Sequence, residues 1–264
     1  MHPIAFKIGS FPIYFYGVMM VVAYVAVLLV MRFTRKFEGF SYDQAIDVTI
    51  FAIAGGVIGA RLFYVALNLS VFIKSPLHIF FLREGGLSWH GALLGGLLGM
   101  LALHIFKKMP LGKICDFASV HIILGLAIGR IGCFLNGCCY GKITDVPWAV
   151  EFKGANLAGL RHPTQLYESF LLVITFLFML WWWKRKKFDG EMTMLMFASY
   201  GAIRFFVEFF RSNTPNQYPR GSTLSLAQYF SLALFSIFTT IVIVKRKLIK
   251  GKSIPKNEEP GTII

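Results

Sequence analysis

Charge is scarce in this sequence, and acidic charge most of all. Charged residues make up 15% of the 264 residues, with 13 acidic residues against 27 basic ones. Hydrophobic residues make up 56% and the mean hydropathy is +0.63, a composition that excludes a soluble globular domain of this length. The basic residues fall in short clusters directly after long apolar runs, which is typical of membrane topology and argues against a nucleic-acid-binding face.

The sequence also lacks long polar connections, and its start does not resemble a cleavable leader. The longest loops run to only about 20 residues, too short for a separate soluble domain. The first apolar run has the length of a full membrane span and has no small-x-small cleavage site, so we expect no signal peptide. The sequence therefore predicts one polytopic membrane domain over residues 1–250 and a short tail over 251–264.

Long apolar runs are what the sequence has in abundance. A helix that crosses a bilayer needs about 20 mostly apolar residues, and seven segments meet this requirement. We therefore predict an all-α integral membrane protein with about seven transmembrane helices. The expected spans are 11–31, 45–67, 91–106, 117–138, 167–183, 192–210 and 224–244.

The basic clusters predict the orientation of these spans. Most Lys and Arg residues follow every second span, in the stretches RFTRK, KKMPLGK, KRKK and KRKLIKGKSIPK. The positive-inside rule places these stretches in the cytoplasm. The N-terminus is then outside and the C-terminal tail is cytoplasmic, so the end of the fourth span faces the periplasm or the cell exterior.

Glycines repeat at every fourth position in three of the expected spans. This spacing places small residues on one helix face and allows two backbones to approach closely, so we interpret these glycines as packing residues. They are Gly55 and Gly59, then Gly91, Gly95 and Gly99, then Gly125 and Gly129.

Three arginines lie within apolar spans, where a charge costs at least about 2.5 kcal/mol. Arg204 has Glu208 one turn further along, so these two can form an ion pair. Arg61 and Arg130 have no acidic residue one turn away on their own helices. Because a guanidinium binds phosphate in a bidentate manner, we interpret them as a site for an anionic ligand at membrane depth, with a phospholipid headgroup as the first candidate.

Further polar residues lie at the outer ends of the third, fourth and fifth spans. The stretch GGLSWHGALLGG carries His90, GRIGCFLNGCCYG carries Arg130 and Asn136, and RHPTQLYES carries His162 and Tyr167. A single histidine at such a position is usually a solvated end residue. Three polar ends on the same side of the membrane instead predict one outward-facing site.

Six motifs, in order, resemble the prolipoprotein diacylglyceryl transferase family over about residues 3–245. They are YG at Tyr16, GARLFY, WHGALLGG, GRIGCFLNGCCYG, RHPTQLYE and GAIRFFVEFFR. The resemblance implies a multi-pass enzyme of the bacterial cytoplasmic (inner) membrane. It would move the diacylglyceryl group from phosphatidylglycerol to the lipobox cysteine of a prolipoprotein, with no cofactor and no metal.

The resemblance also implies roles for residues of this chain. The arginine of the signature GRxGNFxNxExxG, which contacts the lipid headgroup in the family, falls on Arg130. We assign catalysis to His90 as general base and to Arg130 and Arg204, which stabilise the departing phosphate. The remaining residues assigned to substrate binding are Tyr16, Arg61, Asn136, Gly141, His162, Tyr167 and Glu208.

Cysteines mark where the chain departs from this family signature. Cys133 replaces the first asparagine and Cys138 replaces the glutamate, with Cys139 next to it. They can be small buried side chains, a disulfide on the outer side, a reactive thiol or a metal site. The spacing Cys-x4-Cys-Cys, with no second ligand pair, gives zinc little support. A thioether on the enzyme would be a dead end, so we expect the acceptor thiol to attack directly and each Cys→Ser variant to keep substantial transfer.

Other functions stay open at this point. An anionic-lipid transporter would also bury arginines, although no inverted repeat is obvious between the halves of the chain. A thiol-redox membrane protein would explain the cysteines, but not His90, Arg61 and Arg204. A related enzyme could also use the same lipid donor with a different acceptor.

Overall fold

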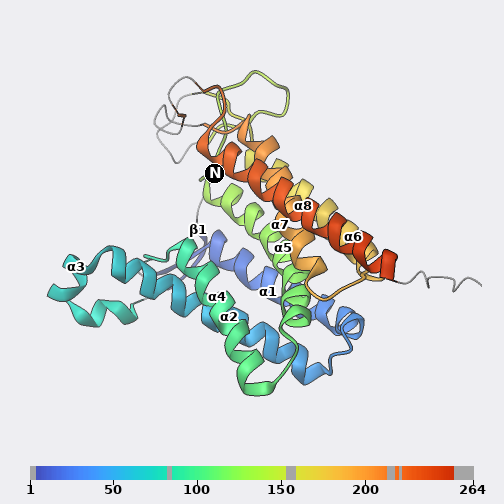
Figure 1. Cartoon of the computed structure of the whole chain (residues 1–264). Coiled ribbons are helices and arrows are strands. Elements are labelled where there is room, and N and C mark those ends of the chain that lie inside the picture. Colours follow the sequence, from blue (N-terminus) through green and yellow to red (C-terminus); the bar gives the residue numbers. More distant parts are fainter. Residues whose placement is uncertain (1–3, 82–84, 153–158, 213–217, 220–221, 253–264) are drawn as a thin grey trace, which may run out of the picture.

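The structure, a computed structural model, describes residues 4–81, 85–152, 159–212, 218–219 and 222–252. Helices dominate it (Figure 1), as the apolar runs predict. In chain order the elements are β1 (Ile4–Ile8), β2 (Phe11–Tyr14), α1 (Phe15–Thr34), η1 (Arg35–Phe37), α2 (Tyr42–Leu67), α3 (Leu69–Lys74), η2 (Pro76–Phe80), α4 (Trp89–Lys107), α5 (Leu111–Asn136), α6 (Thr164–Trp183), α7 (Glu191–Glu208) and α8 (Leu226–Lys252).

The all-α membrane fold is confirmed. Within the described residues, six helices are long and apolar enough to cross a membrane: α1 with η1, α2, α4, α5, α6 and α8. The seventh expected span corresponds to α7, whose 18 residues include Glu191, Arg204 and Glu208, and its crossing stays a prediction. The tail expected from residue 251 begins inside α8, and residues 253–264 lie outside the described part of the chain.

The start of the first span is corrected by the structure. Residues 11–14, expected as helix, form strand β2, which pairs antiparallel with β1. Gly9 at the turn has a φ of +60°, which suits a two-residue hairpin connection. The β-branched and aromatic residues at 4–8 and 11–14, with Pro12 among them, favour an extended edge strand over a helix. The helix therefore begins at Phe15.

The helices form a bundle and a separate hairpin. Helices α1, α5, α6, α7 and α8 pack side by side, whereas α2 and α4 pack on each other and extend away with α3 at their far end (Figure 1). Many large apolar side chains on these helices are exposed, including Leu62 and Phe230. On helices of spanning length, such side chains suit contact with lipid.

Close glycine packing between α2 and α4 is confirmed. A side chain at Gly59 would lie 2.6 Å from the Cα atom of Gly95, and one at Gly95 would collide with the carbonyl oxygen of Gly55. The expectation is wrong for Gly125 and Gly129, since a side chain there would meet nothing within 4 Å. The two glycines on α5 therefore lie on a part of the helix surface that no neighbouring helix among the described residues covers.

A matched pair of alanine variants tests this packing. Gly95→Ala should destabilise the protein by about 3 kcal/mol, because backbone lies on the side where the methyl group must fit. Gly125→Ala adds a methyl group in open space and should be neutral or stabilising by about 0.5–1 kcal/mol, since alanine favours helix. Thermal unfolding in detergent measures both. Equal loss of stability in the two variants would contradict the α2–α4 contact.

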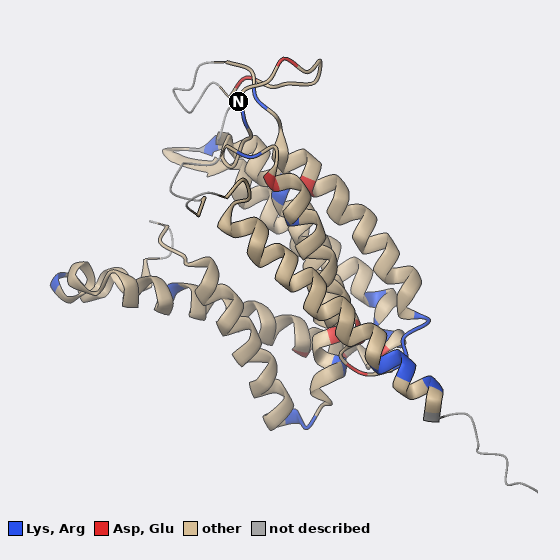
Figure 2. Cartoon of the chain, turned by 45° about the horizontal axis from the view of Figure 1, so that its top comes forward, with Lys and Arg blue, Asp and Glu red and all other residues tan. Residues whose placement is uncertain are grey.

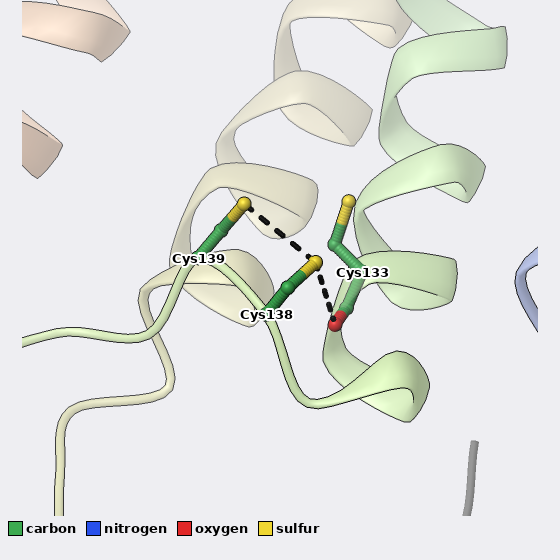
Figure 3. Close-up of side chains that lie close together, drawn as sticks. All are labelled: Cys133, Cys138 and Cys139. Atoms are coloured by element: carbon green, nitrogen blue, oxygen red, sulfur yellow. Dashed lines mark hydrogen bonds between the residues drawn. The ribbon is translucent and has the colours of Figure 1, made fainter. Parts of the chain in front are cut away.

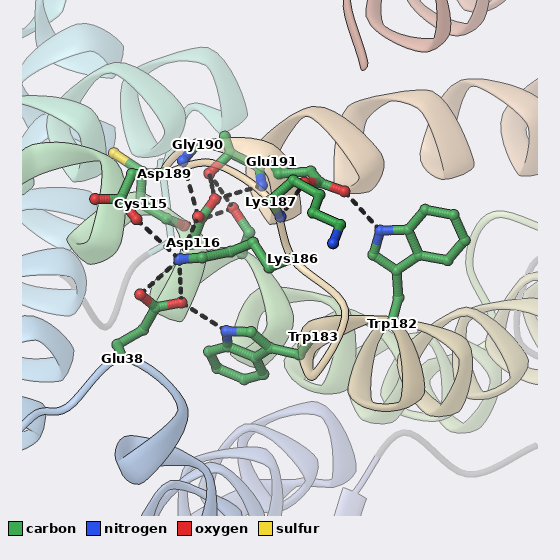
Figure 4. Close-up of polar contacts among 12 residues, drawn as sticks. Glu38, Cys115, Asp116, Trp182, Trp183, Lys186, Lys187, Asp189, Gly190 and Glu191 are labelled. Atoms are coloured by element: carbon green, nitrogen blue, oxygen red, sulfur yellow. Dashed lines mark hydrogen bonds and ion pairs between the residues drawn. The ribbon is translucent and has the colours of Figure 1, made fainter. Parts of the chain in front are cut away.

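Basic residues gather where α1, α4, α6 and α8 end, here called the basic end (Figure 2). At this end Lys186 binds Glu38 at 2.6 Å and Asp116 at 3.1 Å (Figure 4). Trp183 donates to Glu38 at 2.6 Å, while the backbone N–H of Gly190 donates to Asp116. One lysine thus neutralises two buried carboxylates and ties the end of η1, α5 and the α6–α7 loop together.

Removing this lysine should destabilise the bundle in a pH-dependent way. Lys186→Met leaves two buried carboxylates without their cation, at a cost of about 3–5 kcal/mol. Burial already raises the pKa of Glu38 although Lys186 and Trp183 act against it, and loss of the lysine raises that pKa further. The deficit should therefore shrink as the pH falls through the raised value and Glu38 becomes neutral.

Thermal unfolding from neutral to acid pH measures the effect. Lys187→Met is the matched control, because the Lys187 side chain is exposed and only its backbone N–H is used, by Glu191. An unfolding temperature deficit of Lys186→Met that is constant with pH would contradict the prediction.

Candidate active site

The opposite end of the bundle, where α5 ends and α6 begins, is here called the cysteine end. Helix α5 stops at Asn136 because Gly137 takes a φ of +73°. The N–H of Gly137 then reaches the carbonyl of Phe134, and the N–H of Cys138 reaches that of Cys133, both at 3.1 Å. This helix cap turns the chain back, so that Cys138 and Cys139 lie beside the last turn of α5.

The first turn of α6 fixes this segment from the other side. Gln165 donates its side-chain N–H to the carbonyl of Cys138 at 2.5 Å. The hydroxyl of Thr164 donates to the carbonyl of Cys139 at 2.9 Å. Gly141 packs so tightly that an added side chain would lie 2.7 Å from Cβ of His162. Close packing therefore explains the glycine at 141 without a contact to substrate.

Arg130, which has no acidic residue one turn away on its own helix, has a carboxylate partner on another helix. Nη2 of Arg130 lies 2.8 Å from Oε1 of Glu168, which comes from α6 and is 1% exposed. Tyr200 of α7 lies within electrostatic range of both Arg130 and Arg204. Arg130 is therefore held in place by the Glu168 carboxylate and by the side chain of Tyr200.

The predicted ion pair between Arg204 and Glu208 is confirmed. Their side chains lie 2.8 Å apart, and Ser225 donates to the same glutamate at 3.3 Å. Nη1 of Arg204 is buried and has no hydrogen-bond partner within the described part of the chain. A buried guanidinium N–H without a partner is costly, which suits a site that receives an anion.

Arg61 has a different environment from the expected one. The carbonyls of Ile79, Gly85 and Gly86 accept from its Nε and Nη1 atoms at 2.7–3.0 Å. The carbonyls of His78 and Phe81 accept from Nη2. A guanidinium has five N–H donors, and here five carbonyls use them. Arg61 thus holds the connection between α3 and α4, and its expected role in headgroup binding stays a prediction.

His90 lies on the α2–α4 hairpin. It is the second residue of α4, its side chain is exposed, and its ring lies against Trp89 and Phe63. The connection from α4 to the bundle is at the other end of that helix (Figure 1). His90 and Arg130 thus both lie toward the helix ends away from this connection, and the role of His90 as general base stays a prediction.

The other expected residues lie at the cysteine end. A side chain at Gly132 would lie 3.3 Å from the Tyr16 ring, so Tyr16 is close to Arg130 and Cys133. The ring of His162 is 3.0 Å from the Tyr167 hydroxyl, and partial burial lowers its pKa with help from Lys142. The side chain of Asn136 is exposed and interacts with Cys138.

Several residues of this site have weaker signals in the sequence. Glu168 and Gln165 belong to the polar stretch RHPTQLYES, but their partners lie on another helix, which no spacing within one helix reveals. In the sequence, Tyr200 looks like an ordinary aromatic residue on the apolar face of a helix. The ionisable character of Glu168 in an apolar span was the signal available for it.

The arrangement defines a class of protein. It is a multi-pass membrane protein in which two ion-paired arginines, a tyrosine and a polar turn meet at one end of the helix bundle, a group suited to an anionic lipid headgroup. The family model for prolipoprotein diacylglyceryl transferase matches residues 3–244. The chain belongs to the prolipoprotein diacylglyceryl transferase family.

Curated relatives agree with this assignment, and each bears the name phosphatidylglycerol–prolipoprotein diacylglyceryl transferase. The protein from Bordetella parapertussis is 35% identical over 238 residues, covering 88% of this chain and 90% of its own length. The protein from Geobacter sulfurreducens is 35% identical over 251 residues, covering 93% and 96%. The protein from Pseudoalteromonas translucida is 33% identical over 237 residues, covering 88% of each.

Proposed function

We propose that this chain transfers the diacylglyceryl group of phosphatidylglycerol to the lipobox cysteine thiol of prolipoproteins. Its family membership and the names of its relatives support this function. The observation that carries it is Arg130, fixed by Glu168 and close to Tyr16, at the cysteine end of the bundle. A guanidinium held in place near the end of a membrane-spanning helix suits a phosphodiester headgroup.

The proposed reaction is a displacement at the glyceryl carbon that carries the phosphate. The acceptor thiol gives its proton to a general base, for which His90 is the candidate. Its sulfur forms a bond with this carbon as the carbon–oxygen bond breaks, and glycerol phosphate leaves with the bonding electron pair. Arg130 and Arg204 stabilise the charge that develops on the departing phosphate, while Glu168 and Glu208 orient the two guanidiniums. Tyr16, Asn136, His162 and Tyr167 hold the headgroup.

Mass spectrometry of a lipobox peptide tests this function directly. The purified protein is incubated with phosphatidylglycerol vesicles and a synthetic peptide that contains one cysteine. A diacylglyceryl mass increment on the peptide supports the proposed transfer. Release of glycerol phosphate without that increment would point to the same donor with another acceptor, and neither product would point to a lipid transporter.

We also propose that the protein lies in the bacterial cytoplasmic membrane with the cysteine end facing outward. The clustering of Lys and Arg at the basic end supports this orientation. A reporter enzyme that works only in the cytoplasm should be active when it is fused after residue 256. A reporter that works only outside the cytoplasm should be inactive at the same position. Cleavage of that tail by protease added outside the cell would overturn the orientation.

A further inference from the structure

Three cysteines at the cysteine end of the bundle converge on one point. Their sulfur atoms all lie within 4.8 Å of one another, and Sγ of Cys139 is 3.7 Å from Sγ of Cys138 (Figure 3). Cys133 comes from the last turn of α5, and the other two follow the turn at Gly137. All three are free and partly buried thiols.

The backbone holds these thiols together without a bond between them. Cys139 has a φ of +64°, a left-handed conformation uncommon for a residue with a side chain. The hydrogen bonds from Gln165 and Thr164 to the carbonyls of Cys138 and Cys139 fix the orientation of both residues. The cluster is therefore built by α6 as well as by α5.

The spacing of the sulfurs suits a thiophilic metal ion. A tetrahedral zinc ion binds each sulfur at about 2.3 Å, which places its sulfur ligands roughly 3.8 Å apart. The sulfurs here are 3.7 Å to at most 4.8 Å apart, so small side-chain rotations would bring them to one ion. Three protein ligands leave the fourth position open, as in catalytic rather than structural zinc sites.

We propose that Cys133, Cys138 and Cys139 bind one zinc ion, and that its open position takes the cysteine thiol of the acceptor for transfer. This inference rests on the proposed function for the identity of the acceptor. Arg130 lies one turn before Cys133 and within electrostatic range of Cys133 and Cys139. Its positive charge offsets the net negative charge of a zinc ion with three thiolates, and it places the phosphate of the donor beside the metal.

The chemistry balances without an oxidant or reductant. On binding, the acceptor thiol releases its proton to solvent and forms a zinc–sulfur bond, because a coordinated thiol is deprotonated. A sulfur electron pair then forms the bond with the glyceryl carbon, the carbon–oxygen bond breaks, and glycerol phosphate leaves. The product thioether is a weaker ligand than a thiolate and dissociates. A general base such as His90 is not needed for this step.

Metal binding can be measured apart from catalysis. The purified full-length protein is stripped of metal, reduced, and titrated with Zn²⁺, and bound metal is counted by mass spectrometry. We expect one tightly bound ion per chain, and Co²⁺ in its place should give a sulfur-to-cobalt charge-transfer band. Cys133→Ser, Cys138→Ser and Cys139→Ser should each weaken binding and lose that band.

Cys115 supplies the matched control. It lies near the start of α5, at the other end of the helix from the cluster, so Cys115→Ser should bind zinc as the unchanged protein does. Zinc binding that survives replacement of all three cluster cysteines would overturn the site. So would a thiol count that shows a disulfide among the three in the protein isolated without reductant.

Transfer to the lipobox peptide tests the role of the ion. Each cluster variant should lose about 100-fold or more in transfer rate, the range of a lost proton-transfer catalyst, and chelation should inhibit the unchanged protein until zinc is restored. This reverses the sequence-based expectation that each serine variant keeps substantial transfer. Variants that bind no zinc yet transfer at the full rate would overturn the catalytic role.

The two failures can be told apart. If the unchanged zinc-loaded protein modifies no peptide, the proposed function fails, and so does the acceptor role of the zinc ion. The binding measurements with Zn²⁺ and Co²⁺ decide the metal site in either case.

Discussion

Arg130→Lys should lower kcat/KM for phosphatidylglycerol by about 100-fold or more, the range for loss of a donor that stabilises developing charge. A lysine keeps the positive charge and can still bind Glu168, which is 2.8 Å from the present guanidinium. It cannot bind Glu168 and a phosphate with two parallel hydrogen bonds, because an ammonium is a point charge without the planar fork. The lipobox peptide assay measures the loss, and thermal unfolding in detergent reports whether the variant folds.

Arg246→Lys is the matched control for this variant. Arg246 also binds a fully buried glutamate, Glu191, at 2.6 Å, but at the basic end of the bundle. The two lysine variants should lose similar stability, whereas only Arg130→Lys should lose transfer. Transfer by Arg130→Lys at the rate of Arg246→Lys would remove Arg130 from the site.

The structure changes the expectation for the simpler alanine variant. From the sequence alone, Arg130→Ala should lose only a ligand contact. Because Glu168 is 1% exposed, removal of its partner leaves a buried carboxylate without compensation, at a cost of about 3–5 kcal/mol. Loss of activity in Arg130→Ala therefore mixes unfolding with loss of binding, and the lysine variant separates them.

The sequence predicts what depends on one helix at a time. The positions of the long helices follow from apolar runs, and the Arg204–Glu208 pair follows from residues one turn apart. The partner of Arg130 does not, because Glu168 lies 38 positions later on α6. Contacts between helices depend on how the bundle packs, and periodicity within a helix carries no information about that.

The polar connections were the hardest part to predict. Arg61 and Arg130 look alike in the sequence, as single arginines in apolar spans. The structure separates them, because five backbone carbonyls from residues 78–81 and 85–86 surround Arg61, while Arg130 has a carboxylate. Backbone carbonyls are present in every sequence, so an arginine that binds a loop leaves no signature in residue types.

For the cysteine cluster too, the separation of the residues along the sequence does not reveal how close they lie in the folded chain. Four residues between Cys133 and Cys138 suggest distance along a helix, and zinc motifs of ordinary spacing do not match. The helix cap at Gly137 and the left-handed conformation of Cys139 turn the chain back. Cys138 and Cys139 therefore lie beside Cys133. A glycine directly after the helix was the signal for the cap, but the placement of Cys138 and Cys139 also depends on Thr164 and Gln165 of α6.

Arg204→Lys should reduce kcat more than it raises KM. A lysine at 204 can still form the ion pair with Glu208, which lies 2.8 Å from the guanidinium of Arg204. It has no counterpart of the Nη1 atom of Arg204, which is buried and has no hydrogen-bond partner within the described residues. If that N–H binds the departing phosphate, its contribution grows as negative charge develops, so its loss should lower kcat by about 100-fold. A loss confined to KM would instead mean that Arg204 binds donor and transition state equally.

Steady-state transfer to the lipobox peptide over a range of phosphatidylglycerol concentrations separates kcat from KM. Arg246→Lys again controls for the loss of a buried arginine–glutamate pair, since Glu191 is as deeply buried as Glu208. Because Arg204 is tied to α7 and Arg130 to α5, one phosphate held by both would join the two helices at the cysteine end. Wild-type kcat in Arg204→Lys would leave Arg130 as the sole arginine of the pair that acts on the leaving group.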